Sequence, residues 1–112
     1  MSDAIDRLHK AILQLRQTHA PSSRTAKLVA GGRAKMAKKL MEEATEVTLD
    51  AVGNDREAVI RESADLIYNL TVLWTDMDIS PTDVWQEMER RERLYGLAEK
   101  LHKGPLAVAG SR

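Results

Sequence analysis

The sequence NDREAVIRESADLIYNLTVLWTDM, residues 54–77, decides the fold class. Apolar side chains recur in it every three or four residues, which is the spacing that places them along one face of an α-helix. They are Val59, Leu66, Leu70, Leu73 and Met77, with Ile60, Ile67 and Trp74 beside them. Asn54 can cap the start of this helix, and Glu57 can reach back to it as in a capping box. The stretch therefore predicts one long amphipathic helix.

Turn-forming residues divide the rest of the chain into further helical segments. Between the turns the sequence is rich in Ala, Leu, Glu, Lys, Arg and Met, which favour helices, and no useful length alternates with period two. We expect helices over residues 2–19, 23–52, 54–77 and 80–103, with a glycine pair at 31–32 as a weak break in the second. Because short connections make neighbouring helices antiparallel, the expected fold is an all-α antiparallel bundle of four main helices.

Length and composition exclude several classes of protein. The 112 residues suit one domain, expected over residues 1–103, followed by a flexible tail at 104–112. Seventeen basic residues balance 17 acidic ones, which excludes the overall positive field of a nonspecific nucleic-acid binder. Cys is absent, which excludes a disulfide scaffold, a thiolate metal site and a Cys nucleophile. Without a signal-peptide pattern or an apolar stretch near ~20 residues, we expect a cytoplasmic protein with no membrane partner.

Two acidic clusters stand on either side of Gly53. They are Glu42, Glu43 and Glu46 before it, and Glu62 and Asp65 after it. A helical hairpin that turns near Gly53 would bring the two clusters to about the same height. So many carboxylates repel one another unless a cation lies between them. Their hard oxygen ligands suit Mg²⁺, Mn²⁺ or Ca²⁺ better than zinc.

A second interpretation of these acids stays open on spacing alone. They can form a solvated face that pairs with Lys38, Lys39 and Arg61, because Glu-rich helices are common. The order of charges favours the metal site. Basic residues precede the acids in 23–52, against the preference of the helix dipole. Cations beside a metal cluster suit a substrate that carries a polyphosphate.

Four stretches together carry a resemblance to a known family. They are S-R-T-A-K-L at 23–28, K-K-L-M-E-E-A-T-E at 38–46, G-N-D-R at 53–56 and E-S-A-D-L-I-Y-N-L at 62–70. They resemble phosphoribosyl-ATP pyrophosphohydrolase, a family of the all-α, MazG-like nucleoside triphosphate pyrophosphohydrolases. The resemblance implies a helical homodimer that uses Mg²⁺, or alternatively Mn²⁺. It also implies hydrolysis of the α–β phosphoanhydride of phosphoribosyl-ATP to phosphoribosyl-AMP and pyrophosphate, in histidine biosynthesis.

The resemblance also assigns residues. The residues that match the family's metal-site motifs are Glu42, Glu43, Glu46, Glu62 and Asp65. Lys27, Lys38 and Lys39 match basic positions of the family and are candidates for phosphate contact. Glu43 is our hypothesis for the residue that directs the attacking water, because it lies about 100° from Glu42 on the helical wheel and need not point at the same ion.

Two departures from the family pattern concern the substrate. Met41 stands where members usually have Gly, and Asn69 stands where they usually have His, so both are candidates for substrate specificity. One alternative is therefore a house-cleaning hydrolase of other nucleoside triphosphates. Another is a helical dimerisation module without catalysis, in which the acids are surface decoration. A thin core in a chain of this length predicts a homodimer or a higher homo-oligomer on physical grounds as well.

Overall fold

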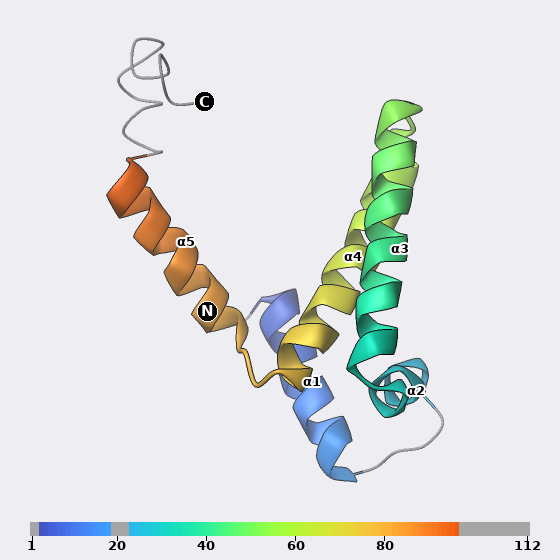
Figure 1. The fold of residues 1–112 in the computed structure, drawn as a ribbon, viewed down its shortest axis with the longest axis vertical. Helices are drawn as coiled ribbons and strands as arrows, with labels where there is room; N and C mark the ends of the chain where they lie inside the picture. The colour runs from blue at the N-terminus through green and yellow to red at the C-terminus, as the bar shows by residue number, and fades with distance from the viewer. Residues whose placement is uncertain (1–2, 19–22, 97–112) are drawn as a thin grey trace. The chain divides into compact units, whose positions relative to one another are not determined.

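The computed structural model describes residues 3–18 and 23–96, and every regular element in them is an α-helix. The helices are α1 (Ala4–Thr18), α2 (Arg24–Gly31), α3 (Arg33–Val52), α4 (Arg56–Asp76) and α5 (Pro81–Tyr95) (Figure 1). The expectation of an all-α fold is confirmed. The first four helices belong to one compact unit, residues 1–81, and the chain from Thr82 belongs to a second, so each unit is described by itself.

The glycine pair breaks the helix expected over residues 23–52 into two. Gly32 has φ +89° and ψ 173°, a backbone conformation that only glycine adopts without strain, so the helical hydrogen-bond ladder ends there. The described residues therefore contain five helices where four main ones were predicted. The short α2 ends at this point and α3 begins at Arg33, which leaves α2 free to lie across the start of α3 (Figure 1).

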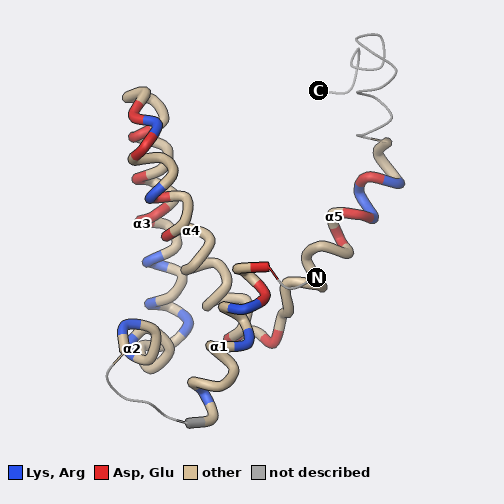
Figure 2. Tube along the Cα trace, turned by 180° about the vertical axis from the view of Figure 1, so that it is seen from behind, with Lys and Arg blue, Asp and Glu red and all other residues tan. Residues whose placement is uncertain are grey.

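A tight turn between α3 and α4 forms the helical hairpin that the sequence predicts. The two helices run side by side in opposite directions from this turn (Figures 1 and 2). The residue that caps α4 is Asp55 and not Asn54: its Oδ1 accepts a hydrogen bond from the Ala58 amide at 3.1 Å. Asn54 instead has φ +60°, and Asn tolerates this left-handed conformation better than other side chains. Asn54 therefore lies in the turn itself, and the helix cap is the next residue, Asp55.

The core of the first unit is small and aliphatic. Its central hydrophobic cluster takes one side chain from each of the four helices: Ile12 from α1, Leu28 from α2, Met36 from α3 and Val72 from α4. Thr75 of α4 anchors α1, because its hydroxyl contacts His9 Nδ1 at 3.0 Å and its carbonyl accepts from Arg16 at 2.8 Å. This core lies toward the end of the hairpin that is remote from the turn, where α1 and α2 cover α3 and α4.

The second unit is described through α5. The helix begins at Pro81, a residue suited to the first helical position, and ends before Gly96, which has φ +61°. Glu87 bonds to both Arg90 at 2.8 Å and Arg91 at 3.0 Å, and these guanidinium groups lower the pKa of Glu87 to about 2. The predicted continuation to residue 103 and the predicted tail at 104–112 lie outside the described residues, so the domain boundary stays a prediction. No helix in the described ranges has the length and apolar character that a bilayer span requires.

Candidate metal centre and adjoining cavity

Three carboxylates converge between α3 and α4. Glu43 comes from α3, and Glu62 and Asp65 come from α4, where their spacing of three residues places them on one face. Each offers one oxygen, and these oxygens all lie within 4.8 Å of one another. The hairpin brings them together because Gly53 lies between the two stretches of sequence. Three carboxylate oxygens at this spacing form the donor set that a hard divalent cation prefers.

The burial of Glu43 strengthens the case for a cation. Its residue is only 6% exposed, and its Oε1 has no hydrogen-bond partner in the part of the chain that the structure describes. Burying an ionised carboxylate without a partner is costly, whereas a bound cation would compensate its charge. The unpartnered oxygen therefore fits a metal centre.

Glu46 and Glu42 differ in their position relative to the three converging carboxylates. The neighbouring Glu62 carboxylate raises the pKa of Glu46, first by a hydrogen bond and then by charge repulsion, so Glu46 lies beside the group on its exposed side. Glu42 is exposed and pairs with Lys39, whose Nζ lies 3.7 Å from its Oε1. Of the five acids expected at the site, the structure brings together Glu43, Glu62 and Asp65, places Glu46 next to Glu62 and leaves Glu42 outside the three-carboxylate group.

A cavity of about 370 Å³ adjoins the carboxylates. Its lining residues are Arg24, Lys27, Leu28, Lys35, Lys39 and Asn69. Lys39 stands one helical turn before Glu43, and Asn69 one turn after Asp65, so the cavity lies next to the carboxylates along both helices. Figure 2 shows the basic residues of α2 and the start of α3 followed by the acidic residues nearer the turn. The cavity with its basic lining thus lies beside the negatively charged carboxylate group.

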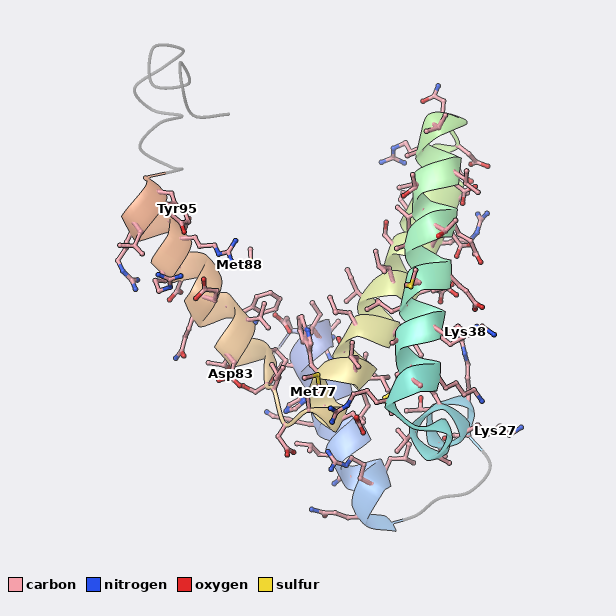
Figure 3. The ribbon with its side chains drawn as sticks, viewed as in Figure 1. Lys27, Lys38, Met77, Asp83, Met88 and Tyr95 are labelled. Atoms are coloured by element: carbon pink, nitrogen blue, oxygen red, sulfur yellow. The ribbon has the colours of Figure 1, made fainter. Side chains whose placement is uncertain are left out.

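The three predicted lysines are not equivalent. Lys27 and Lys39 line the cavity, whereas Lys38 is not among its lining residues. The side chains of Lys27 and Lys38 extend outward from α2 and α3 (Figure 3). Of the three predicted lysines, Lys27 and Lys39 are thus the two that a ligand in the cavity would meet.

Arg24 and Lys35 line the cavity too, and the sequence analysis did not single them out. The guanidinium of Arg24 lies 5.2 Å from the centre of the Tyr68 ring, a cation–π contact. Thr25 and Tyr68 share a hydrogen bond between their hydroxyls across 43 residues of sequence. Tyr68 thereby seats the first turn of α2 against α4. The only available signal was the position of Arg24 directly after the helix cap Ser23, whose side chain accepts from the Ala26 amide.

The two candidates for substrate specificity differ sharply in their surroundings. Met41 is 72% exposed on α3. Asn69 is 1% exposed, lines the cavity, and donates from Nδ2 to the Asp65 carbonyl at 2.8 Å. Its Oδ1 has no hydrogen-bond partner among the described residues. Asn69 is thus a buried polar side chain with one atom unsatisfied.

Comparison with known proteins places this site in a family context. A family model described as phosphoribosyl-ATP pyrophosphohydrolase matches residues 5–92. The chain is 60% identical over 103 residues to phosphoribosyl-ATP pyrophosphatase 2 of Rhodopseudomonas palustris, which covers 92% of this chain and 79% of the relative. It is 56% identical over 108 residues to the protein of that name in Bradyrhizobium diazoefficiens, and the match covers 96% of this chain and 81% of the relative. It is 45% identical over 96 residues to phosphoribosyl-ATP pyrophosphatase of Gluconobacter oxydans, covering 86% and 72%.

Proposed function

Since the chain belongs to the phosphoribosyl-ATP pyrophosphohydrolase family, we infer that it is an enzyme, a hydrolase that converts phosphoribosyl-ATP to phosphoribosyl-AMP and pyrophosphate in histidine biosynthesis. In this reaction water breaks the phosphoanhydride between the α- and β-phosphates. The oxygen of the water goes to one of the two phosphates, and the leaving oxygen stays on the other. The observation that supports this function most strongly is the 56–60% identity to curated relatives that carry the activity in their names.

The cation of this enzyme is Mg²⁺ in our proposal, with Mn²⁺ as an alternative. Glu43, Glu62 and Asp65 would hold it, with Glu46 beside them, and the convergence of the three oxygens and the burial of Glu43 support this assignment. When bound, the cation neutralises charge on the phosphate oxygens that develops as the anhydride breaks. The motif residue Glu42 is not part of this proposed ligand set, because it is exposed and paired with Lys39.

Protein side chains carry the remaining roles. Glu43 directs the attacking water, since a carboxylate has two oxygens and one can face the cation while the other orients the water. Lys27 and Lys39 contact phosphate groups of the substrate from the cavity that they line, and Lys38, which does not line it, stays a prediction for phosphate contact. Asn69 and Met41 remain proposals for residues that influence the choice of substrate.

The active species in our proposal is a homodimer in the cytoplasm, without a nucleic-acid or membrane partner. Large apolar side chains stay exposed along the hairpin of α3 and α4: Met41, Leu49, Val52, Ile60 and Ile67. So many large exposed apolar side chains on one hairpin of a small chain favour an oligomer interface. A second copy of the chain would cover it.

Release of pyrophosphate tests the function directly. The purified protein is given Mg²⁺ with phosphoribosyl-ATP and, in parallel, a panel of ordinary and modified nucleoside triphosphates. We expect a higher kcat/KM for phosphoribosyl-ATP than for any of the others. Preference for another triphosphate would instead assign a house-cleaning role, and the absence of all turnover would favour the non-catalytic dimerisation module.

A further inference from the structure

We propose that the cavity beside the carboxylates receives the phosphoribosyl group of the substrate, and that Asn69 Oδ1 accepts a hydrogen bond from a hydroxyl of that sugar. The inference rests on the proposed function for the identity of the sugar phosphate. It goes further by assigning one part of the substrate to one cavity and one atom of this chain to its recognition.

The orientation of the Asn69 amide follows from its neighbour. The Asp65 carbonyl can only accept a hydrogen bond, so the amide group that contacts it at 2.8 Å is Nδ2. The oxygen is then the atom of this amide that has no bond within the described residues, in a residue that lines the cavity. This oxygen has no hydrogen-bond partner in the described part of the chain, although the residue is only 1% exposed. Buried polar groups nearly always have partners, so this exception indicates a ligand that donates.

The charges that line the cavity point to a phosphate in the same ligand. Arg24 and Lys35 line it with positive charge, and neither forms an ion pair within residues 3–18 and 23–96. The Tyr68 ring holds the Arg24 guanidinium at 5.2 Å, and Tyr68 is the residue directly before Asn69. One turn of α4 thus positions both a phosphate-binding cation and the amide acceptor.

Phosphate alone does not satisfy this combination. The charged oxygens of a dianionic phosphate ester are acceptors, as Asn69 Oδ1 is, so the donor to Asn69 has to be a hydroxyl on the group that carries the phosphate. The β- and γ-phosphates of the substrate have no hydroxyl-bearing group beyond them. A ribose phosphate has both parts, and the cavity volume of about 370 Å³ lies within the range of small-molecule sites.

The substrate contains two phosphorylated riboses, and their chemistry distinguishes them. The ribose of the nucleoside is joined to the α-phosphate, which must lie at the carboxylates for the anhydride to break there. The phosphoribosyl group carries a separate 5-phosphate, whose charge needs cations away from that centre. We therefore assign the cavity to the phosphoribosyl group.

Binding measured by calorimetry on the full chain tests the cavity without turnover. The probes are ribose 5-phosphate and methyl phosphate at about pH 8, where both phosphates are dianions and only the sugar carries hydroxyl donors. We expect the wild-type protein to bind ribose 5-phosphate about tenfold more tightly than methyl phosphate, the size of effect that one hydrogen bond to a buried acceptor supplies. Asn69→Leu should remove this difference. Thr71→Val is the matched control, because Thr71 is also buried in α4 but bonds only to its own helix at the Ile67 carbonyl. It should bind as the wild type does.

Kinetic measurements distinguish recognition of the phosphoribosyl group in the cavity from an effect on the hydrolysis itself. Asn69→Leu should lower kcat/KM for phosphoribosyl-ATP by about tenfold or more while changing that for ATP less than twofold, because ATP lacks the phosphoribosyl group. Equal losses on both substrates, or ribose 5-phosphate binding that is unchanged in Asn69→Leu, would overturn the inference. Should the variant not fold, an absence of preference for ribose 5-phosphate over methyl phosphate in the wild type would overturn it as well. A wild-type protein that leaves phosphoribosyl-ATP intact contradicts the proposed function instead, and the binding measurement still tests the cavity.

Discussion

Glu42 and Glu43 are neighbours in the sequence, yet their side chains have different surroundings. Glu43 is 6% exposed and shares a site with Glu62 and Asp65, whereas Glu42 is exposed and lies 3.7 Å from the Lys39 ammonium. A surface ion pair of the second kind contributes little to stability. The motif treats the two acids alike, and the structure distinguishes them.

This difference predicts opposite results for two conservative variants. Glu43→Gln should lower kcat by about 10²-fold or more, since it removes both a charge at the metal centre and the group that directs water. It should also abolish the rise in melting temperature that Mg²⁺ produces by binding the native state. Glu42→Gln should keep both properties within about twofold, because it changes an exposed pair. Thermal melting with and without millimolar Mg²⁺, beside pyrophosphate release, measures them. Comparable losses in the two variants would refute the proposed ligand set.

At the scale of the elements, the turn between α3 and α4 decides whether the site exists. The turn sets the register of the hairpin and therefore the height at which the Glu43 carboxylate meets Glu62 and Asp65. Asp55 caps α4 through the Ala58 amide, and Asn54 provides the left-handed residue at φ +60°.

The division of roles in this turn is testable by stability. Asp55→Ala should reduce the free energy of unfolding by about 1 kcal/mol, the usual cost of losing a helix cap. Asn54→Gly should change it little or raise it slightly, since glycine adopts positive φ without strain. Urea unfolding of both variants measures the two effects. A larger loss for Asn54→Gly than for Asp55→Ala would contradict the assignment of the cap.

The charge pattern of α5 predicts a pH dependence of its own. The pKa of Glu87 falls from the ordinary 4.5 to about 2 because Arg90 and Arg91 stabilise its charged form. A lowered carboxylate pKa adds stability that is fully present above pH 4.5 and is lost as the pH falls toward 2. The contribution is small, since the pair is exposed and salt screens it.

Carbon-detected NMR titration of the Glu87 carboxyl measures this pKa directly. We expect a midpoint near 2 at low salt and a shift back toward 4.5 in about 1 M NaCl, where the screening length is about 3 Å. Replacing both arginines by Gln should produce the same upward shift without salt. A midpoint at 4.5 at low salt would show that the two ion pairs do not persist in solution.

At the scale of the whole molecule, the apolar surface of the hairpin argues for a second chain. Leu49 is 66% and Val52 84% exposed near the turn of the first unit, where the small core does not reach. Burying such side chains contributes about 25 cal/mol for each Å² of apolar surface, which favours association of two copies.

Sedimentation equilibrium at micromolar concentration tests the dimer. The wild-type chain should sediment with about twice its monomer mass of 12.5 kDa, and Leu49→Glu should shift it toward the monomer by placing a charge in the interface. Lys10→Glu on α1 serves as a control, because its site is exposed and outside the hairpin. A wild-type monomer would exclude the proposed dimer.

By itself, the sequence determined the helices and the meeting of the two acidic clusters. Both depend on local properties, namely periodicity, turn residues and the count of residues on either side of Gly53. Only the tertiary structure decided that Glu43 is buried and Glu42 exposed, that Asp55 caps α4, and that Arg24 and Lys35 share a cavity with Asn69. The physical reason is that a helix has the same periodicity whichever face it buries. Which face meets a neighbour, and which side chains distant in sequence then share a cavity, follows from the packing of the helices against one another.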